Sequence, residues 1–146
     1  KLKVAKEFGA TDVFLASEEK PWKIVKKITN GRMAQAVFVT VGSIEAFESA
    51  ARYLSPGGKI YIVGMPRSGD KAKYELVILG ALSQSLIGSK MGETILKRDI
   101  PWLVDLYSQG RLKLDELVSG TWSLEQINEA VADTKTGSAR RNVIVF

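Results

Sequence analysis

Two apolar segments constrain the fold of this chain most strongly. Residues 36–42 (AVFVTVG) and 59–64 (KIYIVG) are apolar at successive positions instead of alternating ones. This pattern is typical of strands that are covered on both faces, as in parallel sheets. Between them, residues 44–54 carry apolar side chains at helical spacing, and Ser43 precedes them where a helix N-cap is expected. The order strand, helix, strand predicts a right-handed βαβ unit and therefore an α/β fold.

The rest of the sequence extends this pattern in both directions. A Ser-x-x-Gln capping box at Ser123 and Gln126 predicts the start of the last helix, and Gly137 follows its end. Residues 74–82 are apolar but do not distinguish a helix from a strand. Further strands are predicted at residues 12–16, 85–89 and 143–146, and further helices at residues 1–8, 21–29 and 99–109.

The composition excludes several kinds of chemistry within these 146 residues. There is no cysteine and no histidine, which rules out disulfides, a Cys/His zinc site, a Ser-His-Asp triad and a histidine base. The net charge is +5, but the 21 Lys and Arg residues are scattered along the chain, so we expect solvated surfaces and no nucleic-acid partner. Since no apolar run approaches the roughly 20 residues of a membrane span, we expect a cytoplasmic protein with no membrane partner.

Four segments of the sequence, taken in order, resemble a known family. They are KLKVAKEFGATDVF, AVFVTVGSIEAFESAARYLSPGGKIYIVGMP, RDIPWLVDLYSQGRLKLDELVS and LEQINEAVADTKTGSARRNVIVF. Together they resemble the C-terminal portion of the zinc-containing medium-chain alcohol dehydrogenases.

The resemblance implies an incomplete Rossmann-type parallel sheet. The first two strands and the Gly-rich phosphate loop of the family have no counterpart in the sequence, and C-terminal helices and a last strand follow the sheet. Residues 1–90 would form a partial NAD(P)-binding domain, with a truncated coenzyme site. Residues 91–146 would pack on a catalytic domain that these residues do not include.

The same resemblance implies an unusual sheet. In the family order 3-2-1-4-5-6, residues 12–16 and 36–42 would be strands three and four, separated by a gap of roughly 14 Å. Two buried strand edges would lack partners, which is costly. The first helix also begins in mid-pattern. We therefore expect the chain to pair with another copy, to rearrange, or to belong to a longer polypeptide.

The resemblance also implies cofactor-binding residues in four places. Three of these places lie where predicted strands end, which is the carboxyl edge at which open α/β sheets bind ligands. The fourth is an arginine, whose guanidinium is suited to a phosphate. Lys90 departs from the apolar residue that the family pattern leads us to expect. The implied residues are Thr40, Val41 and Gly42; Val63, Gly64 and Met65; Ser89, Lys90 and Met91; and Arg141.

The function implied by the resemblance is a share in alcohol oxidation. The chain would hold the nicotinamide side of NAD or NADP while hydride passes between an alcohol or aldehyde and the cofactor. No residue of the chain is expected to be catalytic or to bind metal, since the zinc ligands of the family would lie outside it. The chain by itself is expected to be inactive, and the family suggests a homo-oligomer formed near residues 74–90.

Two alternatives remain at this stage. One is a zinc-free quinone or enoyl reductase of the same superfamily. The other is a non-catalytic nucleotide-binding or assembly module. The absence of Cys and His supports this alternative, whereas the missing phosphate loop argues against it. Ser43 is expected to act as a helix cap and not as a nucleophile, since no base is available to activate it.

Overall fold

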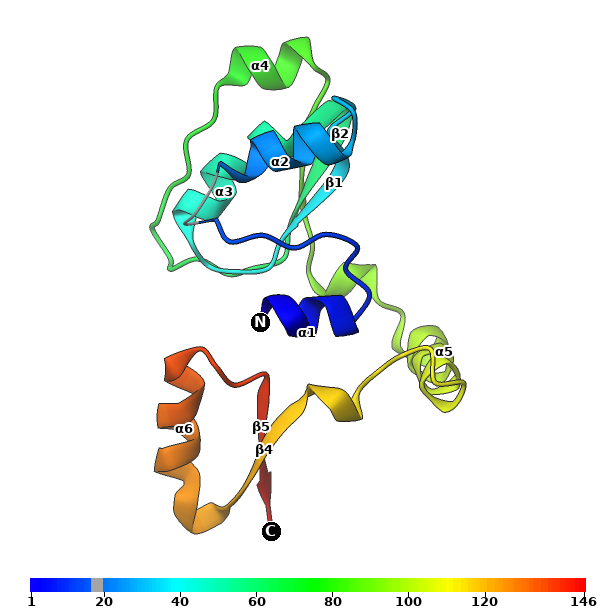
Figure 1. Ribbon diagram of the computed structural model, residues 1–146, viewed down its shortest axis with the longest axis vertical. Coiled ribbons are helices and arrows are strands. Elements are labelled where there is room, and N and C mark those ends of the chain that lie inside the picture. The colour runs from blue at the N-terminus through cyan, green and yellow to red at the C-terminus, as the bar shows by residue number, and fades with distance from the viewer. Residues whose placement is uncertain (17–19) are drawn as a thin grey trace. The chain divides into compact units, whose positions relative to one another are not determined.

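A computed structural model describes residues 1–16 and 20–146 of the chain (Figure 1). The chain forms two compact units. One unit comprises Phe14–Thr94, and the other combines Lys1–Val13 with Ile95–Phe146. We call them the sheet unit and the terminal unit and describe each by itself.

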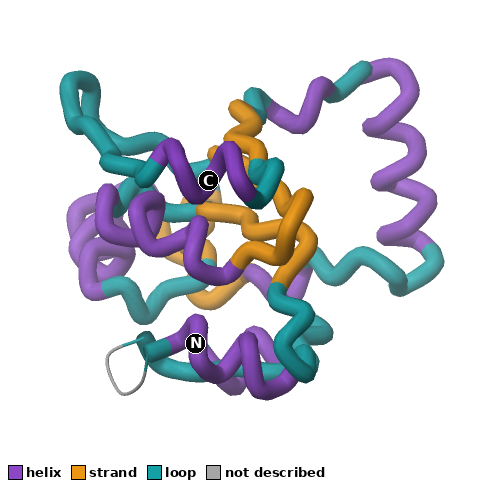
Figure 2. Tube along the Cα trace, turned by 90° about the horizontal axis from the view of Figure 1, so that it is seen from above, coloured by secondary structure: helices purple, strands orange, loops and turns teal. Residues whose placement is uncertain are grey.

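The sheet unit contains three parallel strands in the order β1-β2-β3. The strands are β1 (Ala34–Val39), β2 (Leu54–Ile62) and β3 (Ser85–Gly88), drawn in orange in Figure 2. The helices are α2 (Pro21–Ile28), α3 (Ile44–Ala50), which continues into a 3-10 turn at Ala51–Tyr53, and α4 (Leu76–Ala81). The predicted α/β class with a parallel sheet is confirmed, and residues 76–81 of the ambiguous segment are helical.

Helix α3 begins as the sequence predicts and provides two of the five core residues. The Ser43 side chain accepts a hydrogen bond from the Ala46 N–H at 3.3 Å, which satisfies one donor of the first turn. Phe47 and Ala50 on this helix are buried against one face of the sheet. The core consists of Val39, Phe47, Ala50, Leu54 and Ile60.

The sheet is covered well on one face only, which corrects the expectation of strands buried on both faces. Along β1, Val39 is 5% exposed while its neighbour Phe38 is 62% exposed. Phe38 stacks on Tyr61, which lies opposite it on β2, with ring centroids 4.7 Å apart. Phe38 and Tyr61, which the pattern assigned to a second buried face, thus stack on one another on a face of the sheet that is open in the described residues.

The predicted strand at residues 12–16 is wrong. Residues 12–15 are neither helix nor strand, and residue 17 begins the short stretch outside the described residues. A strand requires a neighbour for its N–H and C=O groups, and in the described sheet only β2 lies beside β1. The predicted gap between strands three and four is therefore also wrong, and β1 instead forms one edge of the sheet.

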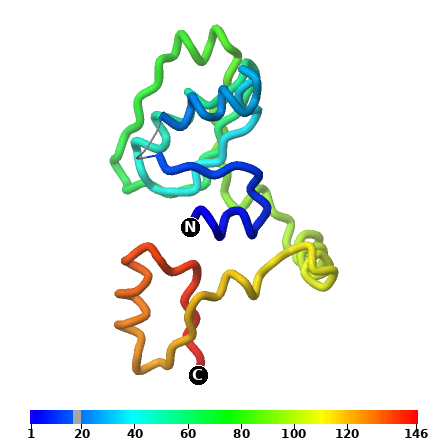
Figure 3. The backbone as a smooth tube through the Cα atoms, viewed as in Figure 1, coloured from blue at the N-terminus to red at the C-terminus, as the bar shows by residue number. Residues whose placement is uncertain are grey.

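Strand β2 begins at Leu54 and not at residue 59. Ala34 pairs with Leu54 but Ala36 pairs with Lys59, so the extra residues of β2 form a bulge. Gly57 within the bulge has a φ of 71°, a left-handed conformation that glycine adopts without strain. The Ser55-Pro56-Gly57-Gly58 segment thus forms an irregular start of the strand. A long loop from residue 63 to residue 75 then leads to α4 (Figure 3).

The terminal unit contains a strand that the sequence analysis missed. Strand β4 (Val118–Ser123) pairs in parallel with β5 (Arg141–Val145), and α6 (Ile127–Thr136) connects them. The predicted capping box is confirmed, since the Ser123 N–H donates to Gln126 Oε1 at 3.2 Å. Gly137 ends α6 in the left-handed conformation, at a φ of 71°. The helix α1 (Leu2–Glu7) also belongs to this unit.

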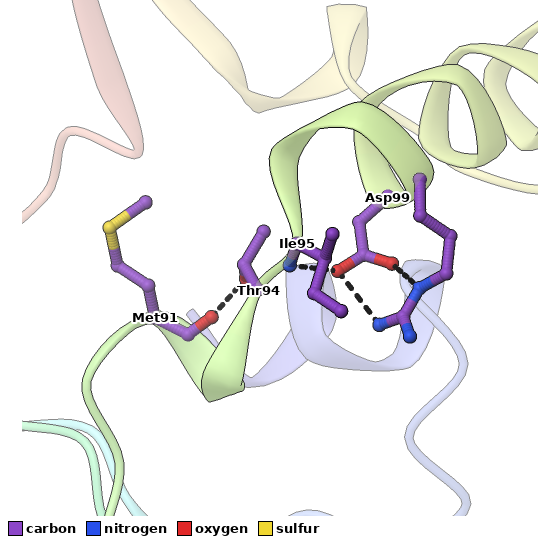
Figure 4. A network of polar contacts seen from close by, with 5 residues as sticks. Met91, Thr94, Ile95 and Asp99 are labelled. Atoms are coloured by element: carbon purple, nitrogen blue, oxygen red, sulfur yellow. Dashed lines mark hydrogen bonds and ion pairs between the residues drawn. The ribbon is translucent and has the colours of Figure 1, made fainter.

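Helix α5 (Leu96–Ser108) begins three residues earlier than predicted, so Pro101 lies inside the helix and not in its first turn. The Asp99 carboxylate accepts a hydrogen bond from the Ile95 N–H at 2.8 Å (Figure 4). It also forms an ion pair with Arg98, whose Nε lies 2.5 Å from Asp99 Oδ1. These bonds lower the pKa of Asp99, the Arg98 side chain first and the Ile95 N–H second. The carboxylate satisfies a backbone donor ahead of the helix and so stabilises the additional turn.

Candidate functional site

Three loops meet at the carboxyl edge of the sheet, where β1, β2 and β3 end. Val39, Ile62 and Gly88 lie in register across the sheet, so the residues that follow them are neighbours. The Val39 carbonyl accepts hydrogen bonds from the N–H groups of both Val63 and Gly64, at 3.1 and 2.7 Å. The Ile62 carbonyl accepts one from Ser89 at 3.1 Å. The first residues of the second and third loops are thus bound to the strand beside them.

The first two loops pack backbone against backbone. A Cβ atom added at Gly64 would lie 2.2 Å from the Val41 carbonyl oxygen, and one added at Gly42 would lie 2.5 Å from the Met65 carbonyl oxygen. Such separations are too short for any side chain. Each loop therefore needs its glycine for close approach to the other, which gives a physical reason for Gly42 and Gly64 at these positions.

The edge also presents backbone groups that the fold does not use. Within residues 1–16 and 20–146, the N–H and C=O groups of Val41 and Met65 make no hydrogen bond. The side chains of both residues are exposed, Met65 by 88%. The edge thus combines backbone groups that have no hydrogen-bond partner among the described residues with exposed apolar side chains.

The third loop has a different conformation. Met91, Gly92 and Glu93 have φ values of 53°, 62° and 57°, which form a left-handed turn. The Met91 carbonyl accepts hydrogen bonds from both the N–H and the hydroxyl of Thr94 (Figure 4). Its carbonyl is therefore engaged within the loop, while its side chain is 73% exposed. Lys90, the departure from the family pattern, is exposed.

Nine of the ten predicted cofactor residues lie in these three loops. The tenth, Arg141, is the first residue of β5 in the terminal unit, where its side chain is exposed. The Ser119 hydroxyl oxygen accepts hydrogen bonds from the N–H groups of Arg140 and Arg141, at 2.9 and 3.2 Å. The structure thus brings the nine residues to one sheet edge and describes Arg141 in the other unit. The role of all ten as cofactor ligands stays a prediction.

The Val39 carbonyl, which binds the start of the second loop to the end of β1, was not among the residues predicted from the sequence. The sequence carried no signal for this, because the predicted strand runs to residue 42 whereas β1 ends at Val39. Two further findings bear on function. The described residues hold no group of three or more Asp and Glu side chains placed to bind a metal ion. No helix in the described part of the chain is long and apolar enough to cross a membrane.

Comparison with known proteins identifies the family. The model of the zinc-binding dehydrogenase family matches residues 1–109, three quarters of the chain. The chain belongs to the zinc-binding dehydrogenase family. The predicted resemblance is therefore confirmed.

Individual relatives agree with this family assignment. The chain is 32% identical to the NDMA-dependent alcohol dehydrogenase of Amycolatopsis methanolica, over 97% of this chain and 38% of the relative. The same values hold for alcohol dehydrogenase B of Mycobacterium tuberculosis. The structure of benzyl alcohol dehydrogenase from Acinetobacter calcoaceticus superposes with a TM-score of 0.92 at 31% identity, over 98% of this chain and 39% of that one. The chain thus spans about 40% of the length of the relatives it matches.

Proposed function

We propose that this chain binds the nicotinamide half of NAD or NADP in a zinc-dependent alcohol dehydrogenase. The observation that carries the proposal is the meeting of three loops at the carboxyl edge of a parallel sheet, with unused backbone groups at Val41 and Met65 in the described residues. Open α/β sheets bind ligands at this edge. Membership of the zinc-binding dehydrogenase family and alcohol dehydrogenase relatives support the same assignment.

The residues of the chain would bind and orient the cofactor. A carboxamide offers two N–H donors and one carbonyl acceptor, and the backbone groups of Val41 and Met65 are matched to it. The exposed apolar side chains beside them would cover one face of the ring and keep water from it. Arg141 would pair with the pyrophosphate, for which a guanidinium is well suited. When bound, the nicotinamide supplies the chemistry by accepting hydride from the alcohol carbon.

The residues of this chain do not fit a zinc site. It has no Cys or His, and its described carboxylates form no cluster of three. We therefore assign no zinc ligand and no step of zinc chemistry to these residues. The metal of the complete enzyme would be held by residues that are not among these 146, which is why the chain alone would turn over no alcohol.

A second copy of the chain would be the partner at residues 74–90. Strand β3 forms the second edge of the described sheet. Leu76 and Val77 on α4, close to it in sequence, are 77% and 76% exposed. An unpaired strand edge with exposed apolar side chains nearby favours association between copies.

The test is an alcohol-dependent reduction of NAD and of NADP by the purified protein, combined with its intact mass and metal content. We expect bound zinc and dinucleotide reduction in a polypeptide heavier than 16.0 kDa, and no turnover by the 146 residues alone. Turnover of quinones or enoyl substrates without zinc would instead establish the reductase alternative. Dinucleotide binding with no turnover of any substrate by the complete protein would establish a non-catalytic module.

A further inference from the structure

A cavity lies in the sheet unit, away from the proposed cofactor edge. Its volume is about 570 Å³, within the range of small-molecule sites. Its lining includes Met33, Leu54 and Gln84, which lie at or just before the first residues of β1, β2 and β3. The cavity is therefore at the amino edge of the sheet. Since β1 has six residues, about 20 Å of strand separates the two edges.

Most of the cavity wall is apolar. Trp22 of α2, Ala51 beside α3, and Ile78, Leu79 and Leu82 in and after α4 line it. These side chains come from three helical segments that surround the amino ends of the strands. An apolar wall of this kind binds an aromatic or aliphatic body by removing its surface from water.

The cavity also carries unbalanced positive charge. Lys26, Arg52 and Lys73 line it, against Glu48 and Glu75. The Glu48 carboxylate accepts a hydrogen bond from the Lys73 backbone N–H at 2.9 Å. In the described part of the chain the one ion pair within 4.0 Å joins Arg98 and Asp99, in the terminal unit. Among the described residues, none of the three lining cations forms an ion pair, and the lining carries one more positive than negative side chain.

A buried acceptor in the lining lacks a donor. Gln84 Nε2 donates to the carbonyls of Leu54 and Ser55, both at 3.4 Å. Its Oε1 atom is buried and has no hydrogen-bond partner among the described residues. Because Oε1 is closed to solvent, a ligand in the cavity would bind to other groups of the lining.

We propose that this cavity binds a small apolar carboxylate. The carboxylate would lie among Lys26, Arg52 and Lys73, and the apolar body would lie against the helical wall. Because the cavity and the cofactor edge are at opposite ends of the same strands, the two ligands would not compete for the same residues. The site is independent of the cofactor-binding role proposed above.

The test is calorimetric titration of the purified protein with three related probes. They are phenylpropionate, its methyl ester, which lacks the charge, and propionate, which lacks the apolar ring. We expect saturable binding of the first, and about tenfold weaker binding of the ester, since a hydrogen bond to a charged group contributes about this factor. Equal affinity for acid and ester, or no saturable binding of any probe, overturns the proposal.

Matched variants locate the binding. Arg52→Gln is expected to weaken the acid about tenfold and to leave the ester unchanged, whereas Arg67→Gln, in an exposed loop outside the lining, leaves both unchanged. Ile78→Trp fills the cavity and abolishes binding, while Val77→Trp, on the same helix but outside the lining, does not. Circular dichroism verifies that each variant is folded. If folded Arg52→Gln and Ile78→Trp bind as tightly as their controls, the proposal is wrong.

Discussion

The backbone of Gly64 lies directly against the backbone of Val41, so closely that a Cβ atom at residue 64 would be 2.2 Å from the Val41 carbonyl oxygen. Gly64 is also buried and donates its N–H to the Val39 carbonyl at 2.7 Å. The loops that follow β1 and β2 thus contact one another through main-chain atoms. This contact requires that residue 64 has no side chain.

A side chain at residue 64 is therefore expected to lower the stability of the protein. Gly64→Ala should lower the free energy of unfolding by about 1–3 kcal/mol, because the backbone of Val41 must move to accept the methyl group. The control is Gly80→Ala, since Gly80 is in helix α4 with nothing within 4 Å of an added Cβ. Denaturant titration measures both. Equal midpoints for Gly64→Ala and the unsubstituted protein would contradict the packing described here.

The core of the sheet unit depends most on Ile60. It is 0% exposed and is the largest fully buried side chain in the described chain. Ile60→Ala should cost about 2–5 kcal/mol in unfolding free energy, from lost burial and the cavity that remains. The matched control is Leu76→Ala, since Leu76 is 77% exposed and should change stability by less than about 0.5 kcal/mol. Similar losses at both positions, measured by denaturant titration, would contradict the assigned core.

The cap of helix α3 also fixes where the first loop ends. Ser43→Ala should lower the unfolding free energy by about 1 kcal/mol, because the Ala46 N–H loses its acceptor. Ser43→Asn retains an acceptor and should restore most of the stability. If Ser43→Ala left stability unchanged but abolished turnover, the hydroxyl would act in chemistry and the capping role would be wrong.

The start of helix α5 predicts a pH dependence. The pKa of Asp99 lies below its ordinary value because Arg98 and the Ile95 N–H donate to the carboxylate. A carboxyl whose folded pKa is lowered stabilises the fold above its unfolded pKa, and this contribution is lost as pH falls through the folded value. Carboxyl-carbon NMR titration should therefore show Asp99 titrating at lower pH than an unperturbed aspartate. Arg98→Gln should shift it back up, and an unchanged titration in that variant would contradict the assignment of the cause.

The sequence predicted those elements whose signals are local. Ser43 and the Ser123–Gln126 box were recognised because a capping hydrogen bond is formed within four residues. The parallel strands were recognised from their continuous apolar runs, and the three loops at their carboxyl ends followed from parallel pairing. These predictions depended on interactions that neighbouring residues determine.

The wrong predictions concern features that depend on distant residues. Residues 12–16 are as apolar as a strand, but a strand exists only beside a partner. Phe38 is apolar enough for a core, but Tyr61 on the next strand is what covers it. Strand β4 was missed because Val118–Ser123 is half polar and is defined by its pairing with β5. The amino-edge cavity had no sequence signal, since its lining comes from segments between Trp22 and Gln84.

The central claim is that the three loops at the carboxyl edge bind nicotinamide. The most direct measurement is backbone amide NMR of the protein during titration with nicotinamide mononucleotide. We predict chemical-shift changes concentrated in residues 40–42, 63–65 and 89–91, with little change at Met33, Leu54 or Gln84 on the opposite edge. Changes concentrated on that opposite edge, or none at saturating ligand, would contradict the claim.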